Sequence, residues 1–79
     1  MNKEYERFIY LLKMYRKTSG KTQKDIANEL GTTQSFVSKY ENNQRRLDLI
    51  ETMNIIEIIG IDKIKFLKEL EKGIKWFFL

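Results

Sequence analysis

Short segments bounded by helix-start and helix-stop signals divide this chain, and they constrain its fold more than any other feature. Thr22 and Asp25 have the spacing of a capping box, in which two side chains three residues apart each bond the other residue's backbone amide. Asp48 and Glu51 repeat that spacing. Glycine readily adopts the left-handed conformation that ends a helix, and it stands at positions 20, 31 and 60. Because the sequence contains no proline, this pattern predicts several short helices with few other breaks.

Between these signals, apolar residues recur at spacings of three and four, as they do along one face of a helix. The first segment carries Phe8, Leu11, Leu12 and Tyr15 in this pattern. Thr33 is placed to cap a further helix, which two asparagines follow. We therefore expect five helices: at residues 4–18, between Thr22 and Gly31, at 34–42, between Asp48 and Gly60, and between Asp62 and Gly73.

The fourth segment is rich in isoleucine, and there a strand competes with a helix. Its β-branched run at positions 55, 56, 58 and 59 favours a strand. Glu57 interrupts the run and helix signals flank it, so we expect a helix. The apolar face expected for this helix consists of Leu49, Ile50, Met53, Ile56 and Ile59, and that of the fifth helix of Ile64, Phe66, Leu67 and Leu70.

Length and composition bound the possible functions. Seventy-nine residues form one domain. The sequence has neither cysteine nor histidine, which excludes disulfide scaffolds, thiolate metal sites and catalysis by either residue. No phosphate-binding loop is visible, so we expect no enzyme, no cofactor and no metal. Residues 1–46 hold ten Lys or Arg and five acids, a net charge of +5, whereas residues 47–79 carry −1. A polyanionic partner and a solvated basic surface explain this asymmetry equally well.

The middle of the chain has the sequence form of a helix-turn-helix, with two segments of about eight residues joined by a turn that contains one glycine. Residues 22–31 read TQKDIANELG, and residues 32–42 read TTQSFVSKYEN. This stretch closely resembles the Cro/phage-repressor-like (Xre) family of helix-turn-helix regulators, and the similarity extends over roughly residues 5–72. It implies an all-α, compact five-helix DNA-binding domain with a central helix-turn-helix, here residues 1–73.

The resemblance implies which side chains read the DNA sequence. In this family the third helix enters the major groove, and its first residues reach base edges. The matching positions are Gln34, Ser35 and Lys39. Glutamine bonds adenine at two atoms, lysine reaches guanine, and serine serves either base. A solvated helix start is the alternative for these residues, and so is a phosphate contact for Lys39. Phe36 either touches a thymine methyl group or packs on Tyr40, and we favour packing.

A second set of positions matches family residues that contact DNA phosphates. One group lies at the start of the second helix, where free amides and the helix dipole suit an anion. Another follows the third helix, with a solvated loop as the alternative for its arginines. The expected phosphate contacts are Thr22, Gln23, Lys24, Asn42, Gln44, Arg45 and Arg46.

The resemblance also implies a structural brace. An arginine at the end of the family's first helix pairs with a glutamate at the end of the third, and Arg16 and Glu41 match these positions. Lys21 departs from the family, which often has an apolar residue there. It weakens one core contact or adds a basic group near the DNA.

The last six residues, Ile74–Leu79, form a C-terminal tail with five apolar side chains. Family members usually bind two half-sites as dimers. We therefore expect a homodimer, with this tail and the fifth helix in the interface. Folding back onto Phe8, Leu12 and the fifth helix is the alternative, and a membrane or partner-protein role is a third.

These observations together predict a sequence-specific regulator that binds a double-stranded DNA operator. We expect it to act as a repressor, because a bound protein occupies the promoter. The alternative is an antitoxin-like protein-interaction module with the same fold and a partner protein. The N-terminus is charged, no apolar run reaches the ~20 residues of a membrane span, and we expect a cytoplasmic, nucleoid-associated protein of a prokaryote or phage.

Overall fold

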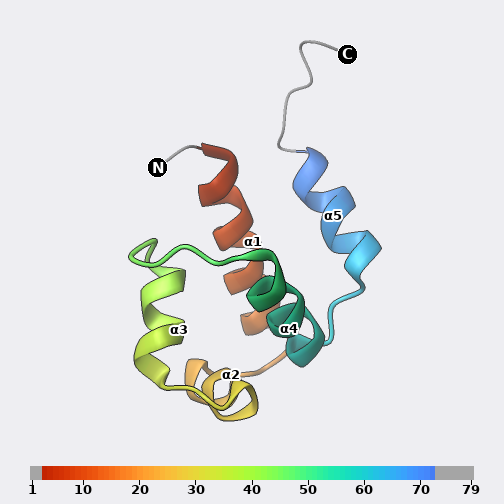
Figure 1. Cartoon of the computed structure of the whole chain (residues 1–79). Coiled ribbons are helices and arrows are strands. Elements are labelled where there is room, and N and C mark those ends of the chain that lie inside the picture. Colours follow the sequence, from red (N-terminus) through yellow and green to blue (C-terminus); the bar gives the residue numbers. More distant parts are fainter. Residues whose placement is uncertain (1–2, 73–79) are drawn as a thin grey trace.

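The structure is a computed structural model that describes residues 3–72. This part of the chain contains five helices and no strand (Figure 1). The all-α prediction is therefore confirmed, and the isoleucine-rich segment is a helix. The tail predicted at 74–79 lies outside the described residues. The helices are α1 (Lys3–Thr18), α2 (Gln23–Leu30), α3 (Gln34–Glu41), α4 (Leu49–Ile59) and α5 (Lys63–Lys72).

Both predicted capping boxes are present, and each fixes where a helix begins. The Asp25 amide donates to Thr22 Oγ1 at 3.0 Å, and the Thr22 amide donates to Asp25 Oδ2 at 2.8 Å. This backbone hydrogen bond from Thr22 lowers the pKa of the Asp25 carboxyl. Asp48 and Glu51 make the same reciprocal pair at 2.7 and 3.0 Å at the start of α4. The helix starts thus follow from interactions within four consecutive residues.

The turn between α2 and α3 depends on backbone conformation at Gly31. Its φ is +72°, and the following Thr32 amide donates to Ala27 O at 2.9 Å, which closes the helix end. A Cβ atom at Gly31 would meet no atom within 4 Å, so conformation rather than space favours glycine here. After α3 the left-handed residue is Asn43, with a φ of +60°.

One core receives a side chain from every helix. Phe66 of α5 lies between Phe8 and Tyr15 of α1, with ring centroids 6.1 and 6.0 Å away. α2 and α3 supply the small Ala27 and the fully buried Val37, which allow these two helices to pack closely. The largest fully buried side chains are Leu12, Ile26, Val37, Tyr40, Ile55 and Phe66.

The apolar faces predicted for α4 and α5 are partly wrong. Ile56 and Ile59 are buried as expected, but Ile55 takes the central buried position of α4. Because α4 is apolar on most sides, its sequence pattern does not define which face meets the core. Five large apolar side chains are exposed instead, and we call them the α4–α5 apolar surface: Leu49, Ile50, Met53, Ile64 and Leu67.

Candidate nucleic-acid interface

The first turns of α3 present the three predicted base-reading side chains to solvent. Gln34, Ser35 and Lys39 are all exposed, whereas Val37 on the same helix is fully buried. Their side chains form no hydrogen bond or ion pair within residues 3–72. Thr33 Oγ1 accepts from the Phe36 amide at 3.2 Å and fixes the start of the helix. The helix therefore holds these polar groups on a defined edge, available to a ligand.

Phe36 packs within the protein, as we favoured from the sequence. It is half-buried, and its ring meets the Tyr40 ring edge-on at 5.7 Å. The guanidinium of Arg45 lies over the Phe36 ring, 4.6 Å from the ring centroid. Phe36 thus connects α3 to the loop that follows it.

The predicted phosphate contacts at the start of α2 differ in their surroundings. Thr22 and Lys24 are exposed, while Gln23 is half-buried. The first amides of a helix have no intrahelical acceptor, so those of Gln23 and Lys24 point past the end of α2. The helix dipole adds partial positive charge at the same place. This turn can therefore accept an anion such as a phosphate oxygen.

The loop after α3 holds the remaining predicted phosphate contacts, and two of them already bond within the protein. The side-chain amide nitrogen of Asn42, Nδ2, donates to the backbone oxygen of Ser38 at 2.9 Å and stabilises the end of α3. Arg45 donates to both carboxylate oxygens of Glu51, at 3.1 and 2.8 Å. These bonds lower the pKa of the Glu51 carboxyl and raise that of Arg45. Arg45 is thus anchored to α4.

Gln44 and Arg46 of the same loop are exposed, and their side chains form no hydrogen bond or ion pair within residues 3–72. The Arg46 guanidinium stacks on the Tyr5 ring at 4.0 Å, a contact that leaves its N–H groups able to bind an oxygen ligand. Tyr5 Oη also accepts a hydrogen bond from the Leu47 amide at 3.0 Å, which fastens the loop to α1. Arg46 is therefore a better oriented candidate for an anion contact than Arg45.

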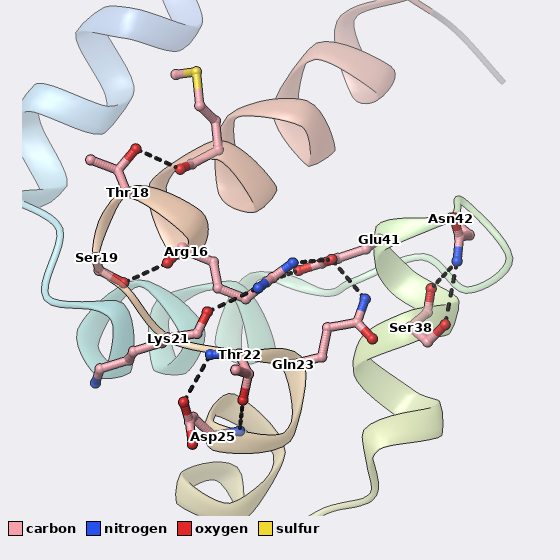
Figure 2. A network of polar contacts seen from close by, with 11 residues as sticks. Arg16, Thr18, Ser19, Lys21, Thr22, Gln23, Asp25, Ser38, Glu41 and Asn42 are labelled. Carbon is pink, nitrogen blue, oxygen red and sulfur yellow. Dashed lines mark hydrogen bonds and ion pairs between the residues drawn. The ribbon is translucent and has the colours of Figure 1, made fainter.

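A buried ion pair joins α1 to α3, between the residues that the resemblance implied. Arg16 Nε and Nη2 donate to Glu41 Oε2 and Oε1 at 2.7 and 3.1 Å (Figure 2). Arg16 is 7% exposed and Glu41 6%. Arg16 Nη1 donates to Lys21 O at 2.9 Å. The pair thus fixes the end of α1, the loop before α2 and the end of α3 relative to one another.

Sequence reasoning missed that Gln23 belongs to this network. Gln23 Nε2 donates to Glu41 Oε1 at 2.9 Å, which brings the first turn of α2 beside the last turn of α3 (Figure 2). The two residues are 18 positions apart, and no local pattern relates them. Only the angle between the two helices makes them neighbours.

The side chain of Lys21, the departure from the family pattern, forms separate polar contacts, although its backbone oxygen accepts from Arg16. Its Nζ donates to Glu29 Oε2 of α2 at 3.0 Å and to the backbone oxygen of Ile58 in α4. Where the family often has an apolar residue, Lys21 thus forms hydrogen bonds that link α2 to α4.

Two kinds of feature are absent from the described residues. No helix within 3–72 is long and apolar enough to cross a membrane. The same residues contain no group of three or more acidic side chains placed to hold a metal ion.

Comparison with known proteins gives similarity over nearly the whole described chain. A family model described as helix-turn-helix matches residues 12–66. An Xre-family-like protein from Pseudomonas syringae pv. tomato is 44% identical, with 91% of this chain and 88% of that chain covered and a TM-score of 0.84. The restriction-modification controller protein C.Esp1396I shares the fold at 22% identity, with coverage of 91% and 94% and a TM-score of 0.83. A tetramer of that controller bound to its natural 35-base-pair operator aligns at 22% identity, with coverage of 91% and 95% and a TM-score of 0.82. No curated protein matches.

Proposed function

This chain belongs to the Xre family of helix-turn-helix DNA-binding regulators, and we propose that it is a sequence-specific transcriptional repressor that inserts α3 into the major groove of an operator. The observation that carries the proposal is the exposed edge of α3 formed by Gln34, Ser35 and Lys39, whose side chains have no polar partner among residues 3–72. Repression follows when the bound protein occupies a promoter. The nucleoid in a prokaryotic cytoplasm is the place where such a protein acts.

Each proposed reader has a chemical match among base edges. The Gln34 amide offers one donor and one acceptor, which suit N7 and N6 of adenine. Lys39 reaches acceptors of guanine, and the Ser35 hydroxyl can donate or accept. The capped start of α3 holds the three groups in fixed order, so their contacts select a base sequence.

The proposed phosphate contacts lie at the start of α2 and in the loop after α3. Thr22, Gln23 and Lys24 offer donors at the start of α2, where the dipole favours an anion. The loop after α3 offers Asn42, Gln44, Arg45 and Arg46, and of these Asn42 and Arg45 also bond within the protein. The net charge of +5 on residues 1–46 supplies the long-range attraction to DNA.

We infer a homodimer on two half-sites, because one small module makes too few base contacts for high specificity. The α4–α5 apolar surface supports self-association, and Leu49, Met53 and Leu67 of this surface line a groove of ≈ 500 Å³ beside α1. The solved controller tetramer on its operator shows one related assembly of this fold. Leu67→Asp should yield a monomer in sedimentation, whereas a dimer of unchanged affinity would refute this placement. A 1:1 complex with a second protein on this surface would instead favour the interaction-module alternative.

Selection of bound sequences from a random DNA pool tests the function directly. The wild-type chain should enrich a motif, and Gln34→Ala should lose about 1–3 kcal/mol on that motif with relaxed preference at one base pair. Asn54→Ala, an exposed side chain on α4, serves as the matched control and should keep the motif. Absence of any enriched motif would overturn the proposal, and an unchanged motif for Gln34→Ala would remove Gln34 from the readers.

A further inference from the structure

The Glu41 carboxylate is an acceptor for two elements at once. Its Oε1 accepts from Arg16 Nη2 at 3.1 Å and from Gln23 Nε2 at 2.9 Å, while its Oε2 accepts from Arg16 Nε at 2.7 Å. The side chain of Glu41 is 1% exposed, so water does not compete for these positions. Arg16 therefore holds the carboxylate in one place, and the carboxylate in turn holds Gln23.

This contact fixes which way the Gln23 amide faces. A carboxylate only accepts hydrogen bonds, so the amide nitrogen rather than the amide oxygen must point toward Glu41. One N–H of that nitrogen is used, and the second N–H diverges from it in the plane of the amide. Gln23 is the first residue of α2 and half-buried, and no other bond of its amide is present among residues 3–72, so this second donor is left for a ligand at the same turn as the free backbone amides.

We propose that the buried Arg16–Glu41 pair positions Gln23 as a phosphate ligand, so that the pair sets DNA affinity in addition to holding the fold. The inference rests on the proposed function, since the ligand is a phosphate of the bound operator. Arg16 and Glu41 touch no DNA themselves and act as positioning residues.

The physical basis is the number of conformations that Gln23 would otherwise adopt. A free glutamine side chain has several rotamers, and ordering such a side chain opposes binding. In this structure the Glu41 contact has already selected one of them. Glu41 also ends α3, so the same contact sets the spacing between the phosphate-binding turn of α2 and the helix that reads the bases.

A double-mutant cycle on operator affinity tests the coupling. The background variant combines Arg16→Met with Glu41→Leu, because an apolar pair of similar volume often preserves a fold in which a single charge could not remain buried. Gln23→Ala should weaken operator binding about fivefold in the wild-type chain and less than about twofold in the apolar-pair background. Arg46→Ala is the matched control, since Arg46 stacks on Tyr5 outside the network and should cost the same factor in both.

The outcomes separate this inference from the proposed function. If Gln23→Ala costs the same factor in both backgrounds, the positioning role is overturned while operator binding stands. If the wild-type chain binds no selected DNA, the proposed function fails and the inference fails with it. Circular dichroism establishes that the apolar-pair variant is folded before the comparison is made.

Side-chain NMR relaxation decides the question if the apolar-pair variant does not fold. In the free wild-type chain, the order parameter of the Gln23 side-chain amide should be clearly higher than that of exposed Gln44, because only the Gln23 amide is held by a hydrogen bond among residues 3–72. Equal mobility of the two amides would overturn the inference without any substitution.

Discussion

The buried Arg16–Glu41 ion pair makes Glu41→Gln a strongly destabilising substitution, although the side-chain volume hardly changes. Glutamine keeps the shape of the side chain but removes the charge opposite Arg16, which is 7% exposed. Its amide nitrogen would also face N–H donors of Arg16 or Gln23, which lie within 3.1 Å of the carboxylate oxygens. Leaving one buried charge without its partner costs about 3–5 kcal/mol. A domain of this size has a total stability of roughly 4–12 kcal/mol, so the variant should lose a large part of it.

Urea denaturation followed by circular dichroism measures this loss, at one protein concentration because self-association would change the apparent stability. Glu29→Gln is the matched control. Glu29 pairs with Lys21 at 3.0 Å, but their side chains are 49% and 31% exposed, so this change should cost at most about 1 kcal/mol. Equal losses for the two variants would refute the view that burial makes the Arg16–Glu41 pair important.

Three further predictions follow from other contacts. Tyr40 Oη is buried and has no hydrogen-bond partner within the described residues, so Tyr40→Phe should leave thermal stability unchanged or raise it, and a clear loss would show that the hydroxyl is satisfied. Arg46→Ala should weaken binding to all DNA sequences about equally and reduce the slope of affinity against salt by about 1, whereas altered base preference would exclude a phosphate contact. The pKa values of the Asp25 and Glu51 carboxyls lie below their ordinary 3.8 and 4.5, so the stability that these carboxylates confer is complete above pH 4.5 and is lost as the pH falls through the lowered pKa values. Glu51→Gln should therefore reduce the loss of stability on acidification in a pH series of urea titrations. An unchanged dependence of stability on pH would contradict this prediction.

The interactions that the sequence predicted well are those confined to a few consecutive residues. Thr22 with Asp25, and Asp48 with Glu51, form their capping boxes without help from the rest of the chain. The left-handed turn at Gly31 likewise depends on one residue's backbone. Family resemblance added the relation between Arg16 and Glu41, which local rules do not supply.

Other features depended on how the helices pack. The sequence placed Leu49, Ile50 and Met53 on the apolar face of α4, but the structure exposes them. Apolar residues occur on most sides of this helix, so its pattern does not define which side meets the core. Arg45 bonds Glu51 and lies over the Phe36 ring while it stays exposed, contacts that no spacing along the chain indicated. These assignments required knowledge of which charged and aromatic groups are neighbours in space.

The sequence by itself therefore determined where α2, α3 and α4 begin and end and which edge of α3 carries Gln34, Ser35 and Lys39, since both follow from short-range hydrogen bonds and helical periodicity. Only the tertiary structure decided that Gln23 shares the buried carboxylate of Glu41 with Arg16. That contact exists because three helices meet at fixed angles around one core, and no spacing along the chain encodes such an angle.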